Sequence, residues 1–175
     1  MNVPIAVWID ESGAIVRPNE VAYATDTFRA ITGLDSAKYL DALRDWAANG
    51  STSRFVMKPE DVRRKMRLPS REHALATAHF RLGEYLCAAG HPADAVPHFK
   101  KARELRPEDW TITRQAFALG DPERDYGTTF VKELSKLNGK LYYDLLDLDG
   151  TGRNPEQERI AQEAAERLRK MTGAQ

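Results

Sequence analysis

Residues 75–107 read "LATAHFRLGEYLCAAGHPADAVPHFKKARELRP", and this stretch constrains the fold more than any other part of the chain. Apolar residues recur in it every three or four positions, which indicates amphipathic helices. The pattern predicts one helix over 70–89 and a second over 92–106, with the chain reversing at Gly90. The two helices are therefore expected to lie antiparallel and in contact.

The residue sizes at this predicted helix contact suit close packing. Gly83 and Ala95 are small, so the two helices can approach each other closely, while Phe99 and Leu82 fill the space between them. Pro107 then stops the second helix, because proline cannot continue the helical hydrogen-bond pattern. These residues and their offsets resemble a tetratricopeptide (TPR) repeat, a helix pair of about 34 residues.

The TPR resemblance implies a partner-binding groove lined by the first helix of the pair. Four residues of one helical face would then contact a protein or peptide partner: Thr77, Phe80, Glu84 and Cys87. The alternative is that these side chains only pack against an adjacent part of the chain. A single repeat cannot bury its own apolar faces, so it needs flanking helices. We expect these at 108–119 and 128–137, with Trp110, Thr113 and Phe117 in register to cap the pair.

A second informative stretch is "NVPIAVWIDESGAIVRP", residues 2–18, which reads as a β-hairpin. Residues 5–10 are β-branched and aromatic, "DESG" at 10–13 is a turn signal, and residues 14–16 resume the strand before Pro18 ends it. The nearly continuous apolar character is typical of a strand buried on both faces. Because an isolated hairpin is only marginally stable in water, this one must pack on another element.

Together with a helix predicted at 36–49, the hairpin resembles the second half of a thioredoxin-like fold. It is similar to bacterial redoxins of the TlpA or AhpC/TSA type, particularly those that carry helical repeats after the redoxin domain. The resemblance implies a cis peptide bond between Val3 and Pro4, which would contact substrate backbone beside the redox cysteines. That cysteine segment would precede Val3 and is missing from this sequence.

Two explanations of the missing segment stay open. The chain is expected either to be a truncated form of a longer thiol–disulfide oxidoreductase or to be a genuine short form that shields its half-sheet by pairing. Exposed strand edges invite pairing with another copy, which would give a homodimer, or with another protein.

The expected fold class is α/β followed by all-α, with a partial thioredoxin-like β-hairpin plus helix and then a TPR-like helical region. We expect four segments: a partial thioredoxin-like domain at 1–50, a linker at 51–69, a TPR-like domain at 70–140, and a loop with a C-terminal helix at 141–175. Asn154 and Pro155 are expected to begin this last helix. One apolar stripe is expected along it: Ile160, Ala164, Leu168 and Met171.

Neither the cysteine nor the histidines predict a catalytic or metal site. Cys87 is the only cysteine, so no internal disulfide can form, and we interpret it as a small packing residue. The four histidines are too irregularly spaced for a metal site: His73, His79, His91 and His98. We therefore predict no catalytic residue, no metal and no cofactor.

Residues 147–158, "DLDGTGRNPEQE", partly match a calcium-binding loop. Five residues occupy its positions 1, 3, 5, 6 and 12: Asp147, Asp149, Thr151, Gly152 and Glu158. Asn154 replaces the usual apolar residue at position 8 and no convincing partner loop exists, so we favour a polar loop that leads into a capped helix. The basic run at 63–71 is interpreted as a solvated linker face, because no aromatic residues interleave with it.

The composition limits the classes of partner. The 26 basic and 26 acidic residues balance, so no net charge attracts nucleic acid or an anionic membrane. No apolar run approaches the roughly 20 residues that span a bilayer, and no signal peptide is recognisable, so we expect a cytoplasmic protein. The expected function is a non-catalytic protein-interaction module derived from a redoxin. The alternative is a fragment of a thiol–disulfide oxidoreductase or peroxidase whose catalytic cysteines lie upstream.

Overall fold

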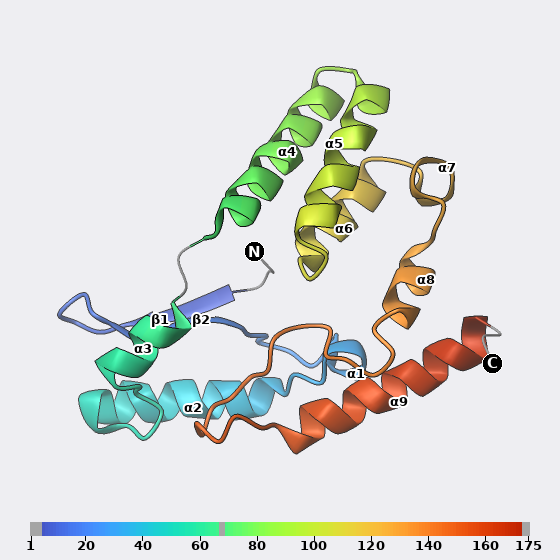
Figure 1. The fold of residues 1–175 in the computed structure, drawn as a ribbon. Coiled ribbons are helices and arrows are strands. Elements are labelled where there is room, and N and C mark those ends of the chain that lie inside the picture. Colours follow the sequence, from blue (N-terminus) through green and yellow to red (C-terminus); the bar gives the residue numbers. More distant parts are fainter. Residues whose placement is uncertain (1–4, 67–68, 173–175) are drawn as a thin grey trace. The chain divides into compact units, whose positions relative to one another are not determined.

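The computed structural model describes residues 5–66 and 69–172, which are mostly helical and include one small antiparallel sheet (Figure 1). The chain divides into two compact units. Residues 69–136 form the first, here called the inserted unit. Residues 5–66 and 137–172 together form the second, called the discontinuous unit. The C-terminal segment, predicted to stand apart from the hairpin, therefore belongs to the same unit as the hairpin.

The β-hairpin of the discontinuous unit forms where the sequence predicts it. β1 (Ile5–Ile9) pairs in antiparallel fashion with β2 (Ile15–Val21). The Asp10 carboxylate holds the turn, because its Oδ1 accepts hydrogen bonds from the backbone N–H groups of Ser12 and Ala14, each at 2.9 Å. This pattern explains why a polar turn sequence connects the two strands.

The second strand is longer than predicted. Pro18 does not end the strand but lies inside it, so that prediction is wrong. The register shifts around this position, between the pair Ala6–Glu20 and the pair Trp8–Arg17. Such a bulge leaves one residue without a ladder partner, which suits proline because it has no N–H to donate.

The other elements of the discontinuous unit are helices that follow the hairpin in the sequence. They are α1 (Arg29–Thr32), α2 (Ser36–Asn49), η1 (Gly50–Thr52), α3 (Pro59–Lys65) and α9 (Pro155–Thr172), and α3 contacts β2. α2 begins as predicted, since the Asp35 carboxylate accepts hydrogen bonds from the backbone N–H groups of Ala37 and Lys38.

The hairpin buries one face, and α2 covers it. The Trp8 indole stacks on Trp46 with 4.9 Å between ring centroids. Its Nε1 also donates a 2.9 Å hydrogen bond to the Tyr39 hydroxyl. Two residues of the first strand remain largely exposed: Val7 at 41% and Ile9 at 55%. The prediction of a strand buried on both faces is therefore wrong, and the hairpin is of the half-solvated antiparallel kind.

A buried arginine ties the hairpin to the C-terminal part of the unit. Arg17 is 2% exposed, and its guanidinium donates to the Glu20 carboxylate at 2.8 Å. It also donates to two backbone carbonyls, of Phe55 at 2.8 Å and of Asp147 at 2.6 Å. The last contact joins residues 130 positions apart and fixes the C-terminal segment beside the hairpin.

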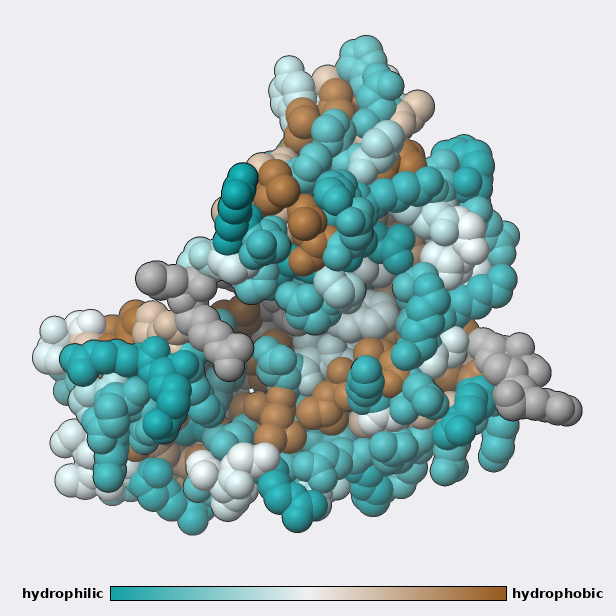
Figure 2. All heavy atoms as spheres, viewed as in Figure 1, coloured by the Kyte–Doolittle hydropathy of each residue, from teal (hydrophilic) through white to brown (hydrophobic). Residues whose placement is uncertain are grey.

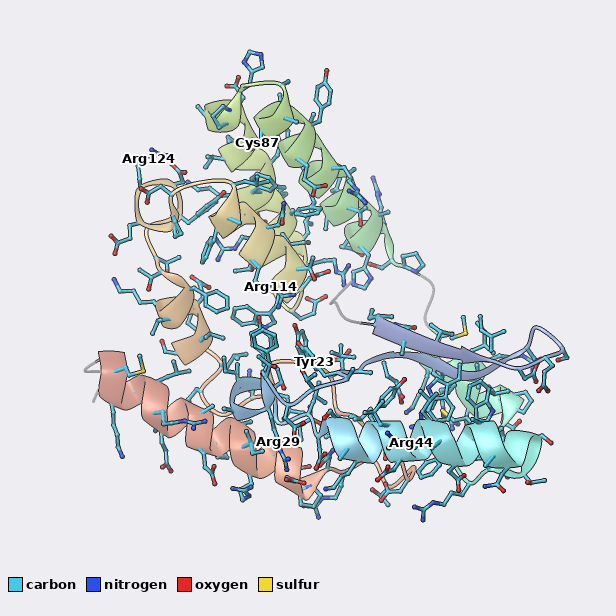
Figure 3. All side chains as sticks on the ribbon, turned by 180° about the vertical axis from the view of Figure 1, so that it is seen from behind. Tyr23, Arg29, Arg44, Cys87, Arg114 and Arg124 are labelled. Carbon is cyan, nitrogen blue, oxygen red and sulfur yellow. The ribbon has the colours of Figure 1, made fainter. Side chains whose placement is uncertain are left out.

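α9 starts at the predicted cap and packs on α1. The Asn154 side chain accepts a hydrogen bond from the backbone N–H of Gln157, and the Gln157 side chain is fully buried. Figure 3 shows Arg29 on α1 beside α9, where it forms an ion pair with Glu156. The predicted apolar stripe ends early, because Met171 is 72% exposed. The buried residues of α9 are Gln157, Ile160, Ala161 and Ala165.

The inserted unit consists of helices in its described residues. They are α4 (Arg71–Ala88), α5 (Pro92–Leu105), α6 (Trp110–Ala118), α7 (Pro122–Tyr126) and α8 (Phe130–Ser135). The predicted helix pair is confirmed, and the chain reverses between its two members at Gly90, where φ is +84°. The two flanking helices are also found, each shorter than predicted, whereas α7 was not predicted.

Candidate interaction surface

The contact between α4 and α5 is as close as the sequence predicts. A Cβ atom added at Gly83 would lie 2.8 Å from Cε1 of Phe99, whose side chain is 1% exposed. Ala95 is fully buried in the same cluster. Leu82 does not fill this contact, because it is 41% exposed. Phe80 takes that place instead, with its ring 5.9 Å from that of Phe99.

α6 covers α5 and completes a small core. Ile112 packs with Ala76 and Ala102, and Ala116 packs with Ala95 and Phe99. The three residues predicted to cap the helix pair are buried or partly buried: Trp110, Thr113 and Phe117. The helix pair is thus covered by a third helix on the α5 side.

The outer face of α4 carries exposed apolar side chains. Leu75 is 44% exposed, Leu82 41% and Tyr85 68%, and their spacing of i, i+7 and i+10 places them along one side of the helix. Ala78 is exposed on the same side. These four residues are called the α4 stripe. Hydrophobic surface over α4 is visible in brown in Figure 2.

The four residues predicted to contact a partner form another face of α4, centred about 160° around the helix axis from the α4 stripe, with Thr77 nearest to the stripe at about 80° from Tyr85. Thr77 is exposed, and its hydroxyl donates to the carbonyl of His73 in the preceding turn. Glu84 is partly buried and forms an ion pair with Arg81 at 2.9 Å. Phe80 and Cys87 are partly buried and pack against the cluster around Phe99. The structure therefore divides these four side chains between solvent and core.

Cys87 has the environment of a packing residue. It is the only cysteine in the chain, and burial raises the pKa of its thiol above the ordinary value. A thiol with a raised pKa is protonated at neutral pH, and the protonated form is a poor nucleophile.

The hairpin presents a second exposed apolar surface, formed by Val7 and Ile9. In the described residues the sheet has two strands, so each has an outer edge. On the β2 edge, the backbone N–H of Met57 donates to the carbonyl of Val16 at 3.0 Å. Val3 and Pro4, the predicted substrate-binding residues, lie outside the described residues.

The loop before α9 holds its own side chains by internal hydrogen bonds. The Asp147 carboxylate accepts from the backbone of Gly152, and Asp149 accepts from the backbone and the hydroxyl of Thr151. Glu158 lies 3.5 Å from Arg153 in an ion pair. Across the described residues no group of three or more His, Cys, Asp or Glu side chains is arranged to hold a metal ion.

Comparisons with known proteins add no assignment. No family model, no curated protein and no solved structure matches this chain. None of the helices in the described parts of the chain is both long and apolar enough to cross a bilayer.

Proposed function

We propose that the inserted unit is a non-catalytic protein-interaction module whose α4 stripe receives an amphipathic helix of a partner protein. The observation that carries the proposal is the exposure of three large apolar side chains along one helix: Leu75, Leu82 and Tyr85. Exposed apolar residues scattered singly are ordinary, but a row of them along one face marks a contact surface.

The position of the stripe within the helical stack supports a helix as the occupant. α5 packs on one side of α4, and α6 continues the stack beyond α5. Stacked helix pairs bury each outward face against the next helix of the array. The outer face of α4 has the i, i+7, i+10 spacing with which one helix packs against another.

The size of the stripe predicts a weak and reversible complex. Complete burial of a leucine contributes about 1.5–3 kcal/mol, so three side chains that are roughly half exposed contribute on the order of 2–4 kcal/mol. The remaining affinity must come from polar contacts at the rim, where the Arg81–Glu84 ion pair flanks the stripe. A second copy of the chain could present the same stripe, and the experiment below distinguishes this occupant.

The alternative function, thiol–disulfide exchange, has no support from the side chains of this chain. It needs a redox cysteine that is accessible and has a lowered pKa. Cys87 is the only cysteine, and burial raises its pKa. The redoxin origin of the hairpin stays a proposal. Because Cys87 is the only cysteine and its pKa is raised, we expect that the purified chain does not reduce insulin disulfides.

Site-specific photo-crosslinking tests the proposed surface. A photoreactive phenylalanine analogue is placed at Tyr85, on the α4 stripe, or at Thr77, which is exposed outside the stripe, about 80° from Tyr85 around the helix axis and about 140° from Leu82. We expect crosslinks from position 85 to one protein, and their loss when Leu82→Glu is added. A peptide of the crosslinked partner segment should then bind as a helix, with Leu82→Glu weakening its affinity at least about tenfold.

Three results would overturn the proposal. Crosslinks from position 77 and not from position 85 would place the contact in the TPR-like groove. Crosslinks from position 85 to a second copy alone would make the stripe a self-association surface. Equal affinity of the peptide for the wild type and for Leu82→Glu would show that the stripe does not bind it. Thr77→Glu serves as the charge-matched control and is expected to leave the affinity unchanged.

A further inference from the structure

Two histidines that are far apart in the sequence meet across the α4–α5 contact. The Nδ1 atoms of His79 and His98 lie 2.9 Å apart, and the two ring centroids are 5.2 Å apart. The two residues stand at similar distances on either side of Gly90, where the helix pair reverses. The antiparallel arrangement therefore brings them level with each other, although their spacing in the sequence follows no metal-binding pattern.

The two nitrogen atoms face the same point in space. At this distance one ring donates its Nδ1–H to the lone pair of the other, so both nitrogens aim at the position between them. A neutral imidazole nitrogen is a common ligand of zinc, copper and nickel ions. We infer that His79 and His98 bind a divalent transition-metal ion through Nδ1, with the shared ring proton moving to Nε2.

The geometry needs little adjustment to hold a metal ion. Zinc–nitrogen bonds of about 2.0–2.1 Å in a tetrahedral arrangement place two ligand nitrogens about 3.3 Å apart. The observed 2.9 Å separation must therefore widen by about 0.4 Å, which small side-chain rotations supply. His98 directly precedes Phe99, which is 1% exposed, so its backbone is held by the core.

Two protein ligands define a site with open positions. No third His, Cys, Asp or Glu of the described residues joins the pair in a cluster, so water fills the remaining coordination positions. Such a site binds more weakly than a four-ligand structural site and exchanges its metal readily. Since the two ligands stand on different helices, a bound ion links α4 to α5 and stabilises their contact.

Calorimetric titration of the full chain, carrying no polyhistidine tag, tests the inference. We expect one equivalent of Zn²⁺ or Cu²⁺ to bind, with the copper ion bound more tightly, as the stability order of divalent ions predicts. His79→Gln and His98→Gln should each weaken binding at least about tenfold. His73→Gln and His91→Gln are matched controls, because they remove the other two histidines of the inserted unit, and they should leave the affinity within about twofold.

A second measurement keeps the test decisive where a variant loses its fold. Ring-nitrogen NMR spectra of the wild type with Zn²⁺ should show the Nδ1 signals of two histidines shifting together. The inference is overturned by the absence of saturable binding in the wild type. It is also overturned if His73→Gln or His91→Gln abolishes metal binding in the titration while His79→Gln binds as the wild type does. In the NMR spectra, Zn²⁺-induced shifts confined to Nε2 signals would overturn it as well.

Discussion

Gly33→Ala is expected to destabilise the discontinuous unit far more than Gly13→Ala. Both glycines have positive φ, +70° and +84°, so alanine is strained by about 1–2 kcal/mol at either position. A Cβ at Gly13 meets no atom within 4 Å. A Cβ at Gly33 would lie 2.8 Å from the Cα of Gln157, an atom of the α9 backbone that cannot rotate away.

The magnitude follows from adding the two effects. Overpacking a core contact costs about 1–3 kcal/mol, so Gly33→Ala should lose about 2–5 kcal/mol and Gly13→Ala only about 1–2 kcal/mol. For a unit of roughly 100 residues, each 1 kcal/mol lowers the Tm by about 4–8 °C. The two variants belong to the same unit, so their difference isolates the packing of α1 against α9.

Tryptophan fluorescence during urea unfolding measures this difference. Trp8 and Trp46 stack on each other in the discontinuous unit, whereas Trp110 belongs to the inserted unit. Both glycine variants are therefore made in a Trp110→Phe background, where fluorescence reports on the discontinuous unit alone. Equal free energies of unfolding for the two variants would show that Gly33 does not lie against the backbone of α9.

Three other predictions concern single contacts. Gly83→Ala should destabilise the inserted unit by about 1 kcal/mol net, because overpacking against Phe99 exceeds the gain in helix propensity. Adding Phe99→Leu should relieve this loss. A Gly83→Ala variant that is more stable than the wild type would refute the close contact. Arg17→Met should lower the free energy of unfolding of the discontinuous unit by about 3–5 kcal/mol, measured by urea unfolding, because it leaves buried acceptors without a donor. A loss below about 1 kcal/mol would contradict this prediction. The hydrogen bond from Arg124 lowers the pKa of the Asp125 carboxyl from the ordinary 3.8 to about 2. The ionised carboxylate therefore stabilises the folded state at neutral pH, and this contribution is lost as the pH falls from 3.8 through 2. Arg124→Ala should raise this pKa in an NMR titration, and an unchanged value refutes the pairing.

The features that the sequence predicted correctly depend on local chemistry. The Asn154 cap of α9 and the reversal at Gly90 each involve a few neighbouring residues. The close contact at Gly83 was also predictable, because only a small residue allows a large ring such as Phe99 to pack there. Local capping and residue size were therefore enough to place most of the helices.

The features that the sequence did not predict depend on distant partners. The grouping of 137–172 with the hairpin depends on contacts such as that of Arg17 with the Asp147 carbonyl, which no local pattern indicates. The proline rule failed at Pro18 because the strand register shifts there. A repeat template assigned Leu82 to the helix contact, although its helical spacing from Leu75 and Tyr85 already placed it on the outer face.

The interruption of one unit by another sets an order of events during synthesis. The inserted unit is continuous in sequence, so it can fold as soon as it leaves the ribosome. Arg17 must instead wait for a carbonyl that is made 130 residues later, which takes roughly 6–26 seconds at about 5–20 residues per second. During that interval the hairpin lacks its C-terminal packing partner, so the discontinuous unit completes its fold only after the inserted unit has been made.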